Sequence, residues 1–271
     1  IFNYELLWWK IKQNLFYNDK FDYIVSRRII VKDQTGRFVE KNFNINQDYA
    51  RIRGFELTLN RRVQKYLSTT FSAAYQIATG KSNSAQESQL QILQTGSVSP
   101  TVEQYLAWDR PLDLKLMIVF KPDTSFHIGR INFNKVRVFL NSTYKSGLRY
   151  TPYYQNGVEP NGRPIYEPDE LNPFSKLGAA WWNTDLKITK DIIIKRGQQI
   201  SLSIEFKNIF DNKNAAIINP ITGKAYEYGD PLPNTYRDPM YPDPQDNGVP
   251  PFNPARFLTP RQVLAGISWQ F

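Results

Sequence analysis

The sequence predicts an all-β protein: an antiparallel transmembrane up-and-down β-barrel, with about eight strands in this chain. Three observations predict it. Apolar and polar residues alternate with a period of two, the connections alternate between short and long, and the chain closes on an amphipathic strand that ends in an aromatic residue. A β-sandwich would show the same alternation, so the connections and the final strand decide in favour of the barrel. No run of about 18 apolar residues occurs, so no transmembrane helix is expected.

The alternating stretches follow one another along the whole chain. The first two are long and are expected to be joined by a turn at Asp33-Gln34-Thr35-Gly36. In order, the clearest alternation covers residues 6–31, 38–61, 67–78, 114–121, 136–141, 183–189, 199–207 and 261–271. No stretch shows a convincing helical period of about 3.6 residues.

The connections between these strands differ in length in a regular way. Residues 61–66 and 194–198 are short and residues 121–135 are moderate, whereas residues 78–110, 146–181 and 211–260 are long. Outer-membrane barrels have short periplasmic turns and long external loops. This pattern therefore places the final strand's end on the periplasmic side.

The last strand separates two faces. One face carries Val263, Ala265, Ile267, Trp269 and Phe271, and these side chains are expected to face lipid. The other face carries mainly polar or small residues. The strand continues to the last residue, so the end of the chain is expected to be structural.

Composition excludes several kinds of site. The chain of 271 residues has no cysteine and one histidine, His127, so disulfides, thiol catalysis and a zinc or haem site are not expected. His127 lies in a moderate connection without a nucleophile motif nearby, so we expect no enzyme, no metal and no cofactor. The net charge is +9, but the basic residues are scattered, and no nucleic-acid partner is expected. They form a solvated or lumen-facing surface, or they attract acidic ligands or anionic lipid headgroups.

Four local patterns occur in an order that resembles a known family. Residues 50–59 (ARIRGFELTL) contain a Gly–aromatic–Glu core, and residues 105–111 (YLAWDRP) open the next strand, with Pro111 and no histidine there, a departure from the commonest form. Residues 206–214 (FKNIFDNKN) carry an Asn-hydrophobic-Phe-Asp signature, and Pro260-Arg261 precede the last strand. Together these patterns resemble the C-terminal part of the barrel of a TonB-dependent outer-membrane receptor.

The resemblance implies an architecture and a function. Residues 1–271 would be the C-terminal portion of a barrel of about 22 strands, with the plug domain absent from this chain. A complete eight-stranded barrel fits the even strand number but not the resemblance. The implied function is energy-coupled uptake of a scarce ligand, of the ferric chelate, glycan or peptide class, at the cell outer membrane. The implied partners are outer-membrane lipid, the barrel-insertion machinery, which would read the final strand, and an inner-membrane energy-coupling protein acting through the missing plug.

The sequence also suggests site residues. Arg149, Tyr150, Tyr153 and Tyr154 are expected in a ligand-contacting loop, because aromatic faces and guanidinium groups suit such ligands; the alternative is an aromatic girdle at the outer interface.

Architectural roles are expected for Gly54, Glu56, Asn208 and Asp211. Gly54 would admit a close strand or ring, and Glu56 would point to the lumen and pair with a basic neighbour. Asn208 and Asp211 would end a strand and shape the following loop through side-chain-to-backbone hydrogen bonds.

The connection 211–260 is rich in proline and carries Tyr226, Tyr228, Tyr236 and Tyr241. Proline lowers the entropy cost of ordering a loop, so this connection suits a preorganised surface. A second hypothesis is therefore a structural or interaction barrel in an outer-membrane surface assembly, with this Pro/Tyr-rich loop as the binding surface. A coil that protects the barrel mouth is the alternative for the loop.

Overall fold

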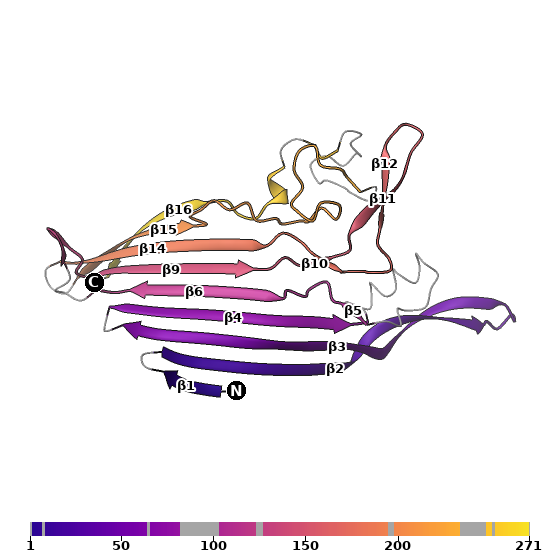
Figure 1. The fold of residues 1–271 in the computed structure, drawn as a ribbon, viewed down its shortest axis with the longest axis horizontal. Helices are drawn as coiled ribbons and strands as arrows, with labels where there is room; N and C mark the ends of the chain where they lie inside the picture. The colour runs from indigo at the N-terminus through magenta and orange to yellow at the C-terminus, as the bar shows by residue number, and fades with distance from the viewer. Residues whose placement is uncertain are drawn as a thin grey trace.

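The computed structural model describes residues 2–6, 9–63, 66–81, 103–122, 127–194, 198–233, 248–250 and 253–270. These residues form a large antiparallel β-sheet with irregular segments and small hairpins at its ends (Figure 1). Within this part of the chain no helix is long and apolar enough to cross a membrane. The predicted all-β, antiparallel class is therefore confirmed.

The sheet has ten strands, nine of which follow one another in chain order. These nine are β1 (Phe2–Leu6), β2 (Trp9–Lys32), β3 (Phe38–Val63), β4 (Leu67–Gly80), β6 (Leu112–Phe120), β9 (Val136–Lys145), β14 (Trp181–Ile193), β15 (Gln199–Lys207) and β16 (Gln262–Gln270). The tenth, β5 (Gln104–Tyr105), pairs with the end of β4. Neighbours in sequence are neighbours in space, as an up-and-down topology requires.

The first strand was predicted wrongly in one respect. It was expected to run without interruption from residue 6 to residue 31, but Leu6 pairs with Trp9, so the chain reverses between them and β1 is a separate strand. A tight hairpin preserves the period of two on both of its arms, so alternation alone does not show the turn. Residues 7 and 8 lie outside the described residues.

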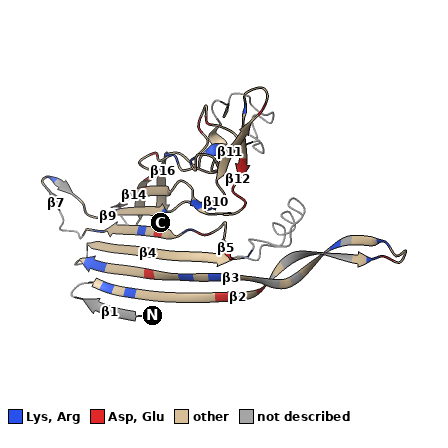
Figure 2. Cartoon of the chain, turned by 45° about the vertical axis from the view of Figure 1, so that its right-hand side comes forward, with Lys and Arg blue, Asp and Glu red and all other residues tan. Residues whose placement is uncertain are grey.

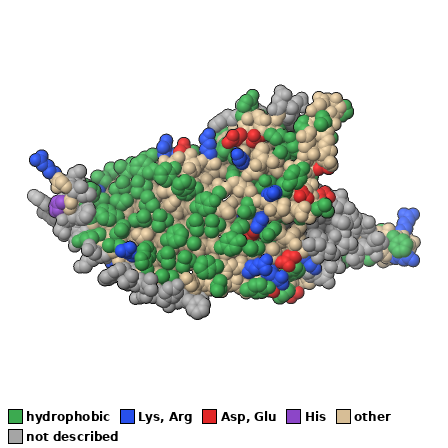
Figure 3. All heavy atoms as spheres, viewed as in Figure 1, with side chains coloured by type: hydrophobic (Ala, Val, Ile, Leu, Met, Phe, Trp, Pro, Cys, Tyr) green, Lys and Arg blue, Asp and Glu red, His purple; other side chains and the backbone are tan. Residues whose placement is uncertain are grey.

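The register brings the predicted apolar residues onto one continuous face. Directly opposite residues of neighbouring strands share a face, and Ile118, Leu140, Leu186, Phe206 and Val263 follow one another across β6, β9, β14, β15 and β16. We call this side of the sheet the apolar face and the other side the polar face. Figure 3 shows hydrophobic side chains gathered over β4, β6, β9 and β14.

Large side chains of the apolar face are open to the surroundings. Val263 is 60% exposed, Ile267 is 78% exposed and Trp269 is 62% exposed. A contiguous apolar surface of this kind is rare on proteins that face water on all sides. It suits contact with lipid, as predicted for the final strand.

Short and long connections gather at opposite ends of the sheet. One end of the sheet, which we call the short-loop end, carries the described parts of residues 121–135 and 194–198, including the hairpin of β7 (His127–Ile128) and β8 (Ile131–Asn132). The opposite end, which we call the long-loop end, carries the described parts of segments 81–111, 146–180 and 208–261 (Figure 1). The predicted alternation of connection lengths is therefore confirmed.

β2 and β3 extend farther than their neighbours at the long-loop end. The last pairing of β3 with β4 is Ala50 with Gly80, whereas β2 and β3 stay paired out to Lys32 and Phe38. The register shifts near Tyr23, and beyond this bulge the pair continues as a twisted two-stranded ribbon (Figure 1). The predicted turn closes the ribbon at residues 33–36, where Gly36 has φ +84°.

The described strands form an open sheet, with β1 at one edge and β16 at the other. The sheet alone is therefore not a closed cylinder. That the chain is an arc within a larger barrel stays a prediction.

Candidate functional site

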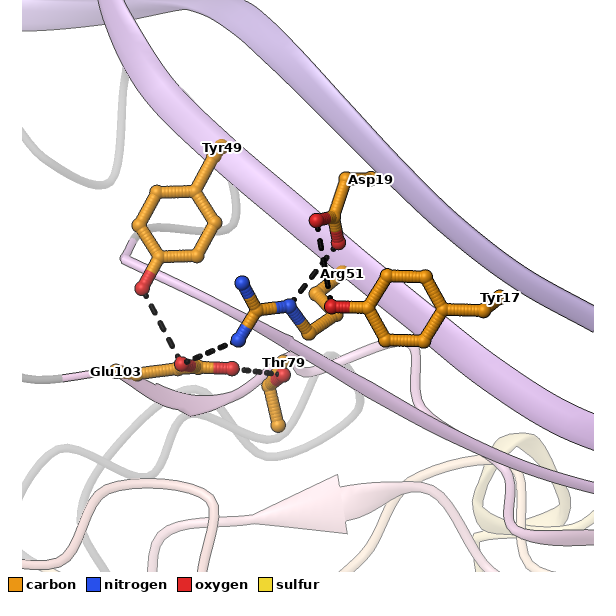
Figure 4. Close-up of polar contacts among 6 residues, drawn as sticks. All are labelled: Tyr17, Asp19, Tyr49, Arg51, Thr79 and Glu103. Atoms are coloured by element: carbon orange, nitrogen blue, oxygen red, sulfur yellow. Dashed lines mark hydrogen bonds and ion pairs between the residues drawn. The ribbon is translucent and has the colours of Figure 1, made fainter.

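The long-loop end carries a network of polar contacts that we call the Arg51 cluster (Figure 4). Arg51 Nε donates to Asp19 Oδ1 at 3.0 Å, and Arg51 Nη1 donates to Glu103 Oε2 at 3.4 Å. The Tyr17 hydroxyl donates to Asp19 at 3.3 Å, the Tyr49 hydroxyl donates to Glu103 at 3.3 Å, and Thr79 also bonds Glu103. Arg51 thus ties β2, β3 and β4 to the segment that leads into β5.

The chemistry of the Arg51 cluster is that of a balanced ion network. Both carboxylates accept hydrogen bonds from the same guanidinium and from neighbouring hydroxyls. The Arg51 guanidinium also lies near the rings of Tyr17 and Tyr49, at 5.8 and 5.9 Å from their centroids. The cluster therefore joins the strands at the long-loop end of the sheet.

A buried ion pair joins segments 81–111 and 146–180 at the long-loop end. Arg149 Nε donates to Asp109 Oδ2 at 2.9 Å, and the guanidinium carbon lies 3.6 Å from the centroid of the Tyr105 ring. Asp109 is fully buried, and its other oxygen accepts the Ala78 backbone N–H at 3.0 Å. Removing one partner of such a buried pair costs about 3–5 kcal/mol.

The four residues predicted to contact ligand, Arg149, Tyr150, Tyr153 and Tyr154, differ in how open their side chains are. Arg149 is used by the protein itself, because its side chain is only 11% exposed and is bonded to Asp109. Tyr153 donates its backbone N–H to the Pro220 carbonyl at 2.9 Å, while Tyr154 is 54% exposed. Among the four predicted residues, Tyr154 has the most open side chain, and ligand contact remains a prediction.

Tyr150 is held against the other long loop. A Cβ on Gly223, which has φ +73°, would lie 2.5 Å from the Tyr150 hydroxyl oxygen. Burial raises the pKa of Tyr150 above its ordinary value, and the neighbouring Tyr154 raises it further. Tyr150 is therefore a packing residue that stays neutral at physiological pH.

A row of exposed aromatic residues lies on β4, β9 and β14 and just beyond the end of β15. Tyr75, Tyr144, Trp182 and Phe210 are 50%, 37%, 45% and 62% exposed. Tyr144 pairs with Trp182, and the Trp182 and Phe210 ring centroids are 5.6 Å apart. This row has the composition of an interfacial girdle. The sequence placed Tyr144 and Trp182 beside the long connection 146–181 but did not single them out as interfacial residues.

The two longest connections dock onto each other. Within 146–180 the chain forms β10 (Arg149–Tyr150) with β13 (Lys176–Leu177), and β11 (Tyr153–Val158) with β12 (Pro164–Pro168). A Cβ on Gly178 would lie 3.0 Å from the Ile218 side chain, so this connection packs closely on 208–261. The second connection has its own small core of Tyr226, Leu232 and Val249. We call the two connections together the loop platform; Tyr236 and Tyr241 lie outside its described residues.

Asn208 and Asp211 form the base of the loop platform. Both have left-handed φ values, +49° and +55°. The Asn208 side chain accepts the Asn212 N–H at 2.9 Å and donates to the Asn212 and Thr259 carbonyls. Asp211 Oδ1 accepts the Arg261 N–H at 2.8 Å, one residue before β16 begins. These bonds join the two ends of the longest connection.

Gly54 and Glu56 both lie on the polar face of β3. A Cβ on Gly54 would lie 2.6 Å from the Phe16 ring and 2.4 Å from the Tyr75 carbonyl oxygen, so the ring occupies the space that glycine leaves. Glu56 accepts a hydrogen bond from the Asn14 amide at 3.1 Å. The expected basic partner of Glu56 is thus replaced by a neutral one, because Asn14 is its direct cross-strand neighbour.

The final strand lies at the sheet edge. β16 pairs with β15 alone, with Val263 opposite Phe206, Ala265 opposite Ile204, Ile267 opposite Leu202 and Trp269 opposite Ile200. This register places the apolar residues of both strands on the same face of the sheet. Phe271, the last residue of the predicted insertion signal, lies outside the described residues.

The part of the chain that the structure describes contains no group of three or more His, Cys, Asp and Glu residues able to hold a metal ion. His127 lies in the β7–β8 hairpin at the short-loop end, and β7 is at the opposite end of the sheet from β5 (Figure 2).

Comparison with known proteins gives a likeness of fold. No protein-family model matches the sequence, and no curated protein matches it. The structure is similar to the crystal structure of the outer membrane transporter YddB from Escherichia coli, with a TM-score of 0.52 and 12% sequence identity. The match covers 79% of this chain and 28% of that chain. The fold is therefore that of part of an outer-membrane transporter barrel, which fits an outer-membrane location.

Proposed function

We propose that this chain is part of the barrel of an outer-membrane transporter of the TonB-dependent kind. The observation that carries the proposal is the open antiparallel sheet itself. Its fold resembles part of the YddB transporter, its apolar face is exposed, and its long connections gather at one end. The transported ligand would be scarce, of the ferric chelate, glycan or peptide class, and uptake would be driven from the inner membrane.

The ion pairs on the polar face support the proposal that this side of the sheet faces the barrel interior. Lys187 and Glu205 approach to 3.5 Å, Lys145 and Asp113 to 3.6 Å, and Arg137 and Asp191 to 2.8 Å. Charged pairs of this kind stay hydrated or contact another polar surface, and they would be costly against lipid. A polar plug or a water-filled channel on this side would keep these charged pairs away from lipid and in contact with water or polar groups.

The loop platform supports a second candidate function. Its small core and its docking contacts make a preorganised surface, which lowers the entropy cost of binding another protein. A structural or interaction barrel in a surface assembly would use this surface without transporting a ligand.

Uptake experiments distinguish the two functions. Cells that produce the full-length protein would be given three labelled probes: a ferric chelate, an oligosaccharide and a peptide. Transport predicts accumulation of one probe, and its loss when the inner-membrane energy-coupling protein is deleted, with surface binding retained. If no probe accumulates, or if accumulation does not depend on coupling, transport is overturned and the interaction function is favoured.

A further inference from the structure

We propose that the apolar face carries, at its long-loop end, a binding site for the phosphate of an outer-leaflet lipid headgroup, with Arg53 as the phosphate-binding residue. The proposal concerns the lipid-facing side of the sheet and does not depend on which ligand is transported.

The position of Arg53 follows from the alternation of β3. Successive side chains of a strand point to opposite faces, so Arg53 lies on the same face as Phe55, Leu57 and Leu59. Its cross-strand neighbours on that face are Tyr17 on β2 and Ile77 on β4. Arg53 is therefore directed to the lipid side, while Glu56 and Arg62 belong to the polar face.

Arg53 also lies at the boundary of the apolar band. On this face of β3 the next charged residue is Arg61, near the short-loop end, where its guanidinium lies 5.2 Å from the centroid of the Trp9 ring. Between the two arginines this face carries only Phe55, Leu57 and Leu59. A tilted strand crosses the hydrocarbon core in about nine to eleven residues, so residues 53–61 cover most of one crossing. In Figure 2 the blue segments of β3 accordingly lie on either side of a stretch in which only Glu56 is charged.

The charge of Arg53 is not used within the described part of the protein. Its side chain is exposed, and neither a hydrogen bond nor an ion pair joins it to a described residue. The adjacent cations have partners within the protein. Arg51 forms ion pairs with Asp19 and Glu103, and Lys81 lies over the Tyr49 ring. Arg53 is thus the cation of this region that remains for an external anion.

The ligand class follows from position and chemistry. The headgroup region beside an apolar band contains lipid phosphates, and a guanidinium donates two parallel hydrogen bonds to a phosphate. The exposed Tyr17 ring, next to Arg53, has the amphipathic character that suits the same interface. The acyl chains of the bound lipid would lie on Phe55 and Leu57, which distinguishes a lipid from free phosphate.

The test measures lipid retention by the full-length protein, purified in an uncharged detergent, with phosphatidylglycerol as the probe and native mass spectrometry as the readout. Arg53→Glu should lower the affinity for phosphatidylglycerol about tenfold, because it replaces an attraction by a repulsion. Arg53→Lys should retain most of the binding. Arg62→Glu, the same substitution on the same strand but on the polar face, should leave binding unchanged.

Each alternative has a distinct result. Equal loss in Arg53→Glu and Arg62→Glu would show a general charge effect and overturn the site, as would unchanged binding in Arg53→Glu. Displacement of the lipid by millimolar inorganic phosphate would show a free-phosphate site and overturn the lipid assignment. Heat-modifiable migration on a gel reports barrel folding, and Arg53→Gln, which should also bind more weakly, replaces Arg53→Glu if that variant does not fold.

Discussion

The Asp109 carboxylate and the Arg149 guanidinium form a buried ion pair, 2.9 Å from Oδ2 to Nε, between the segment before β6 and the start of the loop platform. Arg149 was predicted to contact ligand, yet its charge is neutralised inside the protein. Its contribution to any binding surface is therefore indirect: it holds β10, and with it the neighbouring Tyr153 and Tyr154, in place.

Asp109→Ala should leave the Arg149 charge buried without a partner. We expect a loss of about 3 kcal/mol in the free energy of unfolding, measured by denaturant titration, and faster proteolysis of residues 146–180. Lys187→Ala is the matched control, because its pair with Glu205 is largely exposed and should contribute less than about 1 kcal/mol. Equal effects in the two variants would contradict the structural role of the buried pair.

Gly54→Ala should strain the sheet. The new Cβ would lie 2.6 Å from the Phe16 ring and 2.4 Å from a backbone oxygen, and the second contact cannot be relieved by a side-chain rotation. Overpacking of this kind costs about 1–3 kcal/mol, which a thermal unfolding experiment would detect. Phe16→Ala added to Gly54→Ala should restore only part of the stability. Ser72→Ala, also on the polar face, should have little effect.

Asp211→Ala should loosen the base of the loop platform. It removes the acceptor for the Arg261 N–H and leaves a non-glycine residue with a left-handed φ. We expect faster limited proteolysis of residues 212–260, while β15 and β16 keep their protection in hydrogen exchange. Glu170→Ala removes an exposed carboxylate just after β12 and should leave this cleavage rate unchanged.

The ribbon turn should respond to acid. Hydrogen bonds from the Thr35 side chain and from the Arg37 and Thr35 backbone N–H groups hold the pKa of Asp33 below its ordinary value of 3.8. A lowered folded-state pKa means that the turn is fully stabilised above about pH 4 and loses this stabilisation as the pH falls through the lower value. Amide exchange at Thr35 and Arg37 should therefore accelerate in acid beyond the intrinsic rate. Asp33→Asn should remove that pH dependence.

Deletion of Phe271 should reduce the amount of protein inserted into the outer membrane. The resemblance to receptor barrels makes the final strand a signal for the insertion machinery, and its apolar residues lie in register with those of β15. Quantitative blotting of membrane fractions measures insertion, and binding assays on the inserted molecules should show unchanged ligand affinity. Gln270→Ala, on the other face of the strand, is the control.

The sequence predicted the strands correctly where the two faces of a strand meet different environments. Alternation identified the eight long strands and the apolar face, since a slip of one residue would move every side chain to the wrong side. It could not show the reversal between Leu6 and Trp9, because a tight hairpin keeps the period of two on both of its arms.

The alternation of residues could not predict which side chains of the long connections contact each other. Arg149 has the composition of a binding residue, and only its distance to Asp109, forty positions earlier in the chain, shows that its charge is satisfied. The expected basic partner of Glu56 was wrong for a similar reason: the register of β2 and β3 places Asn14 beside it. By contrast, the local signature at Asn208 and Asp211 indicated the loop base, because Asn and Asp act on neighbouring backbone groups.

The bond between Asp211 and the Arg261 N–H separates two kinds of constraint in this chain. The neck of the connection also includes the bonds from the Leu258 N–H to the Asn214 carbonyl and from the Ala216 N–H to the Arg256 carbonyl, whereas the register of β16 is set by its pairing with β15. Segments of different length and chemistry could thus be exchanged between positions 217 and 253 without displacing β16 from its neighbour. A grafted loop of known affinity, placed at this neck, would turn the same membrane sheet into a receptor for a chosen ligand.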